Sequence, residues 1–234
     1  MSRMSRAKRV TLIHRSPGSL RFRRPDLIVE DPWKTALKFF TENSSSIGTR
    51  SYDTYVIEGA SPPDKLTDAD VSAINKTMGA RSPHGDWANL IKRGDLPELA
   101  AIGRNLDLFQ TPDTVWAKER APIRLAALFR VVIGKGIGIA RATKVLHIKR
   151  PALIPVCDSY VLGLMGIPNV GADSGVALVE HLRAVRKELL PILLDIQERL
   201  RQRGCDRTLV RIVDSLLWSA YPDTWLKHGL VELS

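Results

Sequence analysis

Two glycines around one apolar residue mark the stretch of the chain whose chemistry is easiest to recognise. Gly136-Ile137-Gly138 lets the backbone turn sharply and leaves amide N–H groups open at the start of a predicted helix. Exposed amides beside the positive end of a helix bind an anion such as a phosphate. The alternative is an ordinary corner between two helices, in which the glycines serve only the turn.

Basic residues accompany this turn along the predicted helix that follows it. They are Lys135, Arg141, Lys144, Lys149 and Arg150. Positive side chains near a set of open amides strengthen the attraction for a phosphate backbone. We therefore predict that these five residues, with the three residues of the turn, contact nucleic acid.

Asp158 is the acidic residue of this region with the clearest chemical potential. It precedes Ser159 at the predicted start of a helix, where a carboxylate caps the first turn and contributes about 1 kcal/mol. A carboxylate in that position can also stabilise positive charge that develops on a substrate. Capping alone and capping combined with catalysis both fit the sequence.

The elements that must hold these residues are nearly all helical. Apolar residues recur at three- and four-residue steps through most of the chain. The expected helices are 31–42, 67–78, a short one near 84–87, 96–106, 111–132, 139–148, 158–165, 174–203 and 205–220. Pro122 and Pro191 are expected to bend or split their helices. The fold class is therefore all-α, with one short extended segment near 51–57.

The chain divides into a basic N-terminal arm and one helical domain. Residues 1–24 hold eight Arg or Lys and no acid, so we assign 1–30 to a partly flexible arm. Such an arm suits phosphate contacts on DNA or RNA, or is simply a solvated tail. Residues 31–234 form the helical domain, with the hairpin and its flanking helices at 124–161.

Composition limits the classes of function. The net charge of +10 over 234 residues favours a polyanionic partner, first of all nucleic acid; a merely basic soluble protein is the alternative. Two cysteines and no long apolar run predict a reduced, cytoplasmic protein without membrane spans. The five histidines are scattered, and His84 is taken as structural. No metal, cofactor or Ser/His/Asp triad is expected.

Residues 131–161 resemble known DNA-binding proteins. The pattern from Gly136 through Ala142 to Leu146 resembles the helix-hairpin-helix motif, and the run 155–161 (PVCDSYV) resembles the aspartate segment of the helix-hairpin-helix DNA glycosylase superfamily. The same stretch is similar to an uncharacterised bacterial family of unknown function with Lys-Arg-Pro (149–151) and Pro-x-x-Asp-Ser-x-Val signatures. A looser likeness extends to the run 214–218 (DSLLW).

The resemblance implies a glycosylase-like helical fold, double-stranded DNA as partner and a role in DNA repair. In that superfamily the hairpin holds a DNA phosphate without reading sequence. The enzyme flips a base out of the duplex and cleaves its N-glycosidic bond, and the aspartate, here Asp158, stabilises the positive charge on the sugar.

Departures from the superfamily pattern limit the activity. Bifunctional members carry a lysine just after the second hairpin glycine, where this chain has Ile139 and Ala140. Ser159 and Tyr160 replace the usual Thr-His after the aspartate. A monofunctional glycosylase, a non-enzymatic DNA-binding module and a protein-contact module on the same fold remain the alternatives. An open pocket at Asp158 would favour the enzyme.

Overall fold

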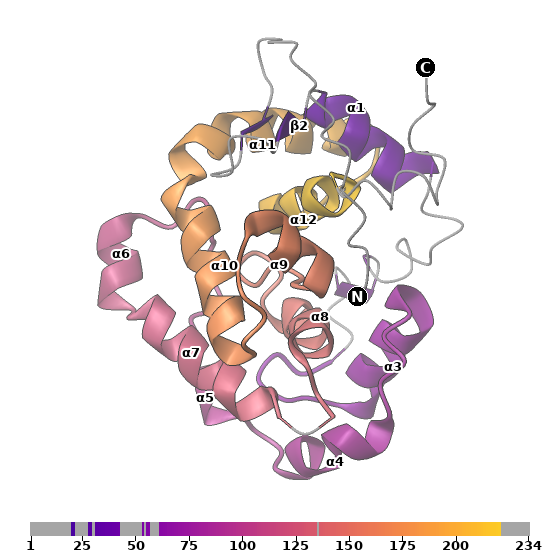
Figure 1. Ribbon diagram of the computed structural model, residues 1–234, viewed down its shortest axis with the longest axis vertical. Coiled ribbons are helices and arrows are strands. Elements are labelled where there is room, and N and C mark those ends of the chain that lie inside the picture. The colour runs from indigo at the N-terminus through magenta and orange to yellow at the C-terminus, as the bar shows by residue number, and fades with distance from the viewer. Residues whose placement is uncertain are drawn as a thin grey trace, which may run out of the picture.

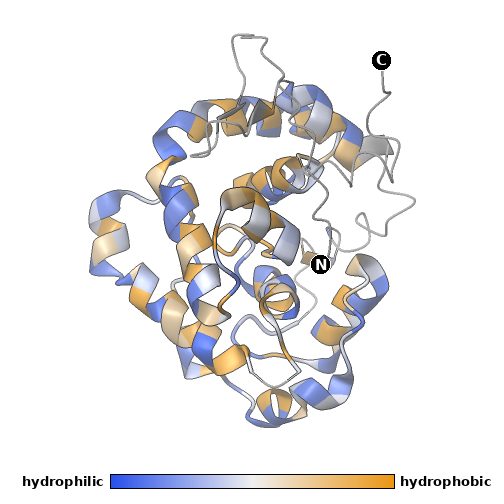
Figure 2. Cartoon of the chain, in the orientation of Figure 1, coloured by the Kyte–Doolittle hydropathy of each residue, from blue (hydrophilic) through white to orange (hydrophobic). Residues whose placement is uncertain are grey.

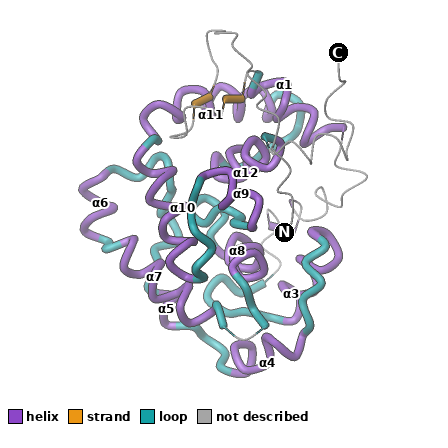
Figure 3. Tube along the Cα trace, in the orientation of Figure 1, coloured by secondary structure: helices purple, strands orange, loops and turns teal. Residues whose placement is uncertain are grey.

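The computed structural model describes residues 20–21, 28–29, 31–42, 53, 55–56, 61–134 and 136–220. This part of the chain is mainly helical, which confirms the predicted fold class at that level (Figures 1 and 3). The helices are α1 (Pro32–Leu37), the π-helix η1 (Lys38–Glu42), α3 (Asp68–Met78), α4 (His84–Lys92), α5 (Pro97–Ala100), α6 (Asp113–Lys118), α7 (Ala121–Val132), α8 (Ile139–Lys149), α9 (Ser159–Met165), α10 (Ala172–Ala184), α11 (Arg186–Arg201) and α12 (Leu209–Ser219).

Helices α8 and α9 lie near the centre of the view, surrounded by the others (Figure 1). Helix α8 packs on α3 and α10, while α9 packs on α10 and α12. One buried apolar cluster extends from Val29 to Leu217, and the largely apolar α12 belongs to it (Figure 2). No helix in the described part is both long enough and apolar enough to cross a membrane.

The contact between α7 and α10 depends on a glycine. A Cβ on Gly175 of α10 would lie 2.9 Å from a ring carbon of Phe129 and 3.0 Å from Cδ1 of Ile139. A side chain at this position would therefore push α10 away from both α7 and the start of α8. The glycine lets the three helices meet closely at the point where the hairpin leaves α7.

Helix starts follow the predicted capping residues. Thr67 and Asp70 form a reciprocal capping box at α3, as their spacing predicts. The side chain of Asp31 accepts a hydrogen bond from Lys34 N (2.8 Å) at the start of α1. Asp158 caps α9. Local sequence is sufficient to predict these helix starts, because a cap is a contact between residues that are near neighbours in the chain.

Several predicted helices have different extents in the structure; the last one, expected at 205–220, begins only at Leu209. The helix expected at 96–106 is only α5, followed by a loop. The helix expected at 111–132 is split into α6 and α7 at Arg120, whose φ of 50° is left-handed. The helix expected at 174–203 is interrupted at Val185, with its ψ of 5°. Pro191 lies inside α11, in its second turn, so the predicted helix is divided at Val185 and not at the proline.

The extended segment expected near 51–57 is wrong for the residues that are described there. Asp53, Tyr55 and Val56 are helical. Asp53 is buried against Arg211 and Arg207, so tertiary ion pairs fix this segment and its weak alternation of apolar residues does not. Within the predicted arm, only β1 (Leu20–Arg21) and β2 (Ile28–Val29) are described, as an antiparallel pair. The rest of the arm and residues 221–234 lie outside the described part.

Lys149 and Arg150 are inside the protein, which corrects the prediction that they contact nucleic acid. Lys149 Nζ lies 2.7 Å from Asp70 Oδ2, and both side chains are at most 1% exposed. Arg150 binds Asp64 Oδ1 (2.8 Å) and carbonyl oxygens that include those of Leu99 and Ile102. These two cations attach the C-terminal end of α8 to α3, to the segment before α3 and to α5.

The buried Lys149–Asp70 pair predicts a large loss of stability when one partner is removed. The substitution Lys149→Met leaves a buried carboxylate without its cation, and we expect the free energy of unfolding to fall by about 3–5 kcal/mol. Urea unfolding followed by circular dichroism measures the change. The control is Lys65→Met, because Lys65 forms an exposed pair with Asp95 whose removal should cost less than about 1 kcal/mol. Equal losses in the two variants would contradict this assignment.

Candidate nucleic-acid interface

A two-residue turn joins α7 to α8. Gly134 N donates to Ile137 O (3.1 Å), and Ile137 N donates to Gly134 O (3.0 Å). The loop between them is Lys135, which lies outside the described residues, and Gly136, whose φ of 82° requires a glycine. Ile137 is buried and anchors the turn in the core, while Gly136 and Gly138 are exposed.

The first turn of α8 presents open backbone amides. Gly138 is the N-cap, and no side chain caps this helix. The Gly138 carbonyl accepts from the amides of Arg141 (3.1 Å) and Ala142 (3.0 Å), which closes the first turn. Among the described hydrogen bonds, none uses the amides of Gly138, Ile139 or Ala140. The positive end of an eleven-residue helix therefore reaches the surface next to the turn.

Arg141 lies at the turn, but its guanidinium is already engaged. It donates to the carbonyls of Gly136 (2.6 Å) and Arg81 (3.0 Å) and lies 3.4 Å from Asp86 Oδ2. A Cβ on Gly136 would meet the Asp86 carboxylate at 2.4–2.5 Å, so this acid packs directly against the turn. Arg141 thus braces the hairpin against α4 and neutralises an acid that would otherwise repel a phosphate.

Lys144 is held at the end of α3. Its Nζ donates to Met78 O (3.1 Å) at the end of α3. Burial lowers the pKa of Lys144, and the nearby Asp158 carboxylate opposes that shift. Lys144 is therefore partly buried and engaged by a backbone carbonyl of α3.

Asp158 uses one carboxylate oxygen as a cap. Oδ1 accepts from the amides of Tyr160 (3.0 Å) and Val161 (2.9 Å). No described hydrogen bond or ion pair uses Oδ2, and the residue is half-buried. Asp158 is not closed over by side chains, and it lines neither the cavity of about 480 Å³ nor the one of about 240 Å³. The carboxylate can therefore cap α9 and still contact a partner.

The backbone before Asp158 is held by hydrogen bonds to two helices, α8 and α12. The amide of Cys157 donates to Thr143 Oγ1 of α8 (2.9 Å), and the amide of Val156 donates to Asp214 Oδ2 of α12 (3.0 Å). Both acceptor side chains are buried. Helices α8 and α12 together therefore fix the position of Asp158.

Asp214 is an unusual residue in this arrangement. It is 4% exposed, and its Oδ1 is buried without a hydrogen-bond partner. Burial raises the pKa of Asp214 to about 7, helped by the charges of Asp158 and Asp53 and opposed by the Val156 amide and by Arg211. The sequence carried one usable signal, an acid within the apolar run of α12.

His84 contacts one acid and one hydroxyl on the surface. His84 Nδ1 lies 3.1 Å from Asp68 Oδ1, and His84 Nε2 lies 3.5 Å from Ser72 Oγ. The second distance exceeds the roughly 2.6–3.2 Å of a nucleophile–base pair. The group is exposed and lines neither cavity, so it is best described as a polar contact between α3 and α4.

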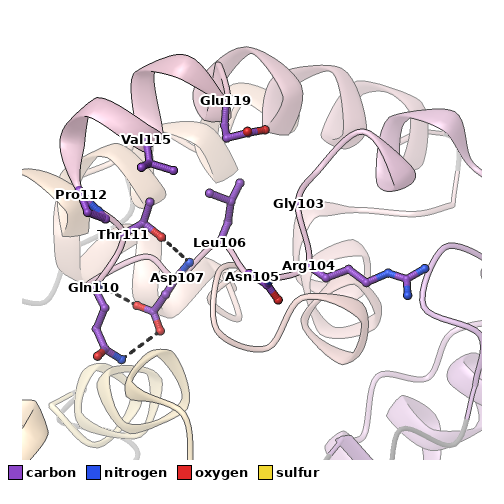
Figure 4. A pocket seen from close by; sticks show the side chains of 10 residues that line it. All are labelled: Gly103, Arg104, Asn105, Leu106, Asp107, Gln110, Thr111, Pro112, Val115 and Glu119. Carbon is purple, nitrogen blue, oxygen red and sulfur yellow. Dashed lines mark hydrogen bonds between the residues drawn. The ribbon is translucent and has the colours of Figure 1, made fainter.

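The larger cavity, of about 480 Å³, lies between the loop after α5 and the start of α6 (Figure 4). Its polar groups bond mainly to one another: Asp107 N donates to Thr111 Oγ1 (2.8 Å), and Gln110 N donates to Asp107 Oδ1 (2.8 Å). The described residues contain no cluster of three or more His, Cys, Asp or Glu suited to a metal ion.

The predicted site residues thus separate into three groups. Gly136, Ile137, Gly138 and Arg141 lie together at the turn, and Lys144 binds the end of α3. Lys149 and Arg150 belong to the interior. Asp86 and Asp214 were not predicted as site residues, although Asp214 begins the run 214–218, because both act through contacts distant in sequence.

Comparison with known proteins gives one result. A family model described as a family of unknown function (DUF6308) matches residues 34–221. No curated protein and no solved structure matches the chain.

The raised pKa of Asp214 predicts a pH-dependent stability. Its ordinary pKa is 3.8 and its folded value is about 7, so the folded state binds the proton more tightly. The stabilisation is fully present below pH 3.8 and is lost as pH rises to about 7, with an upper limit of about 4 kcal/mol. Burial lowers the pKa of His147 from its ordinary 6.5 to about 4. This group therefore has the opposite effect: it makes the free energy of unfolding rise with pH between about 4 and 6.5.

The variant Asp214→Asn distinguishes the pH dependence of stability that Asp214 causes from the one that His147 causes. Urea unfolding of both proteins at pH 5 and pH 8 should show Asp214→Asn gaining stability relative to wild type at the higher pH. Asp95→Asn, an exposed change, is the control. A difference between wild type and Asp214→Asn that stays constant with pH would show that Asp214 does not titrate in this range.

Proposed function

The chain belongs to this family of unknown function, and we propose that it is a DNA-binding protein that holds the duplex backbone through the turn at 134–138 and the first turn of α8. We also infer that α7, the turn, α8 and the Asp158 segment form a helix-hairpin-helix unit similar to that of the DNA glycosylase superfamily. The protein has no sequence preference through this unit, because backbone amides contact phosphates and not bases.

One observation carries the proposal: Gly138 is a glycine that neither the backbone nor the packing requires. Its φ of −79° and ψ of 170° suit any residue, and a Cβ there would meet no atom within 4 Å. Glycine at such a position serves the close approach of another molecule to the backbone. The open amides of α8 make a phosphate the fitting partner.

The distribution of charge along the chain supports separate roles for the arm and the hairpin. Residues 1–24 contain eight cations and no acid, so the remaining chain, with 27 cations and 25 acids, has a net charge of only +2. The arm therefore supplies most of the long-range attraction for a polyanion, while the hairpin supplies a short-range contact.

Base excision by Asp158 is a second candidate function, favoured by the unused Oδ2. In that reaction the bond between the sugar C1′ and the base nitrogen breaks, and its electron pair leaves with the base. A water oxygen bonds to C1′ and its proton passes to the carboxylate, while the base takes a proton from solvent. Ile139 and Ala140 provide no amine after the turn, so the reaction is hydrolysis without strand cleavage.

The hairpin proposal predicts that Gly138→Ala weakens DNA binding without unfolding the protein. A methyl group that blocks one or two charge-assisted hydrogen bonds should cost about 10-fold or more in affinity. The slope of log affinity against log salt should fall by about 0.9 for each phosphate that the variant no longer binds. Fluorescence anisotropy on a short duplex measures both quantities.

The control is Gly103→Ala, whose added Cβ would make only ordinary contacts with Leu106 at 3.6–3.9 Å. Its affinity should match wild type. Thermal unfolding should show both variants folded, since the change from Gly to Ala at an N-cap costs at most about 1 kcal/mol. Wild-type affinity in Gly138→Ala and Gly138→Arg would contradict the hairpin proposal.

The excision proposal predicts that Asp158→Asn loses activity but keeps its cap. Asn retains a side-chain oxygen for the amides of Tyr160 and Val161. A screen of duplexes with single damaged or mismatched bases should show base release by wild type and a loss of at least about 100-fold in Asp158→Asn. DNA binding without base release in wild type would identify a non-enzymatic binding module, and absence of both would favour a protein-contact module.

A further inference from the structure

Tyr160 presents an aromatic ring to solvent beside the candidate acid. The residue is 47% exposed. Every other aromatic residue in the described part of the chain is either buried or, like Trp33, Tyr55 and Trp218, half-buried. Tyrosine is enriched where proteins meet partners, because its ring offers a large apolar face and its hydroxyl tolerates water. This ring is therefore the aromatic surface on which a partner can lie.

The backbone that carries the ring is fixed. Tyr160 belongs to the first turn of α9, and its amide donates to Asp158 Oδ1 (3.0 Å). The next two residues, Val161 and Leu162, are buried in the core. The Cα–Cβ bonds of a helix tilt toward its N-terminus, which in α9 is the end that Asp158 caps. The ring therefore leaves the helix on the same side as the carboxylate.

Gly163 leaves the helix surface next to the ring without a side chain. Residues three apart on a helix are neighbours, so Gly163 adjoins Tyr160. Gly163 is exposed, its φ is not left-handed, and a Cβ there would meet no atom within 4 Å. Glycine inside a helix lowers stability relative to alanine, and neither the backbone nor the packing requires it here. The surface beside Tyr160 thus has room for a flat group.

One hydroxyl connects this place with the hairpin. Thr143 Oγ1 donates to Ile139 O (2.9 Å) and accepts from the amide of Cys157 (2.9 Å). Ile139 is the first residue of α8, and Cys157 directly precedes Asp158. A DNA backbone on the open amides of α8 would therefore pass close to Asp158 and Tyr160.

The chemistry of this place favours a base over a phosphate. The Asp158 carboxylate repels a phosphate and accepts hydrogen bonds from N–H groups. A nucleobase has N–H donors at its edge and a flat face that stacks on an aromatic ring. In an intact duplex that face is covered by the neighbouring bases, so a base must leave the stack to reach a side chain. An unpaired base meets all of these conditions.

We propose that Tyr160 stacks on an unpaired base of the DNA that the hairpin holds, an inference that rests on the proposed function. The hairpin binds any duplex through its backbone, and Tyr160 adds a preference for duplexes in which one base is unpaired. Tyr160 is then a specificity-determining residue. It does not select which base is bound, because every base has a π face.

Fluorescence anisotropy on two duplexes tests the proposal in the full chain. One duplex is fully paired, and the other has the same sequence with one additional, unpaired adenine. Wild type should bind the second at least about 5-fold more tightly, the lower end of the effect of one base–aromatic stack. Tyr160→Ala and Tyr160→Leu should lose this preference, because neither has a ring. Tyr160→Phe should keep it, and all three variants should bind the paired duplex as wild type does.

Two controls separate the ring from other effects. Val170→Ala shortens another exposed apolar side chain, 65% exposed in the loop before α10, and should keep the preference. Gly138→Ala should weaken the binding of both duplexes by the same factor. Thermal unfolding verifies that each variant is folded.

The outcomes distinguish this inference from the proposed function. If wild type binds both duplexes equally, or if Tyr160→Ala keeps the preference, the role of Tyr160 is wrong and the hairpin proposal stands. Equal loss of affinity for both duplexes in Tyr160→Ala also contradicts a stacking role. If wild type binds neither duplex, the hairpin proposal and the inference both fail.

Discussion

The buried ion pair between Lys149 and Asp70 fixes the helix on which both candidate chemical features depend. Charges removed from water must find their partners, so this pair and the neighbouring contacts of Arg150 allow α8 one position against α3. The opposite end of α8 is set by apolar packing, where Ile139 and Phe129 meet Gly175. The open amides of the first turn are therefore held on a rigid support.

The same helix also positions the acid. Thr143 of α8 binds the Cys157 amide, and Asp214 of α12 binds the Val156 amide, so the backbone before Asp158 is fixed by buried polar groups. A buried Asp214 with an unpaired oxygen weakens the fold and raises its own pKa. A buried polar group that lowers stability in this way is typical of residues whose role is to position others, here the backbone before Asp158.

Arginine and lysine have two separate roles in this protein. Some are interior, where a shared carboxylate, carbonyls or aromatic rings receive them, as for Arg150, Arg183 and Arg211. Others lie in the arm at residues 1–24, which carries most of the net charge. A paired interior cation contributes nothing to attraction at a distance, so net charge alone gives no location for a nucleic-acid surface.

The sequence by itself determined what depends on near neighbours. The mainly helical class follows from apolar periodicity, and the capping box at Thr67, the cap at Asp158 and the sharp turn at Gly136 follow from contacts within a few residues. Only the tertiary structure decided which cations are buried, where the helices at 111–132 and 174–203 break, and which acids lie at Gly136 and Val156. The burial of the cations and the positions of these acids depend on residues 50 or more positions apart, such as Asp86 with Arg141 and Asp214 with Val156. Local pattern carries no information on such pairs, because it is packing that brings them together.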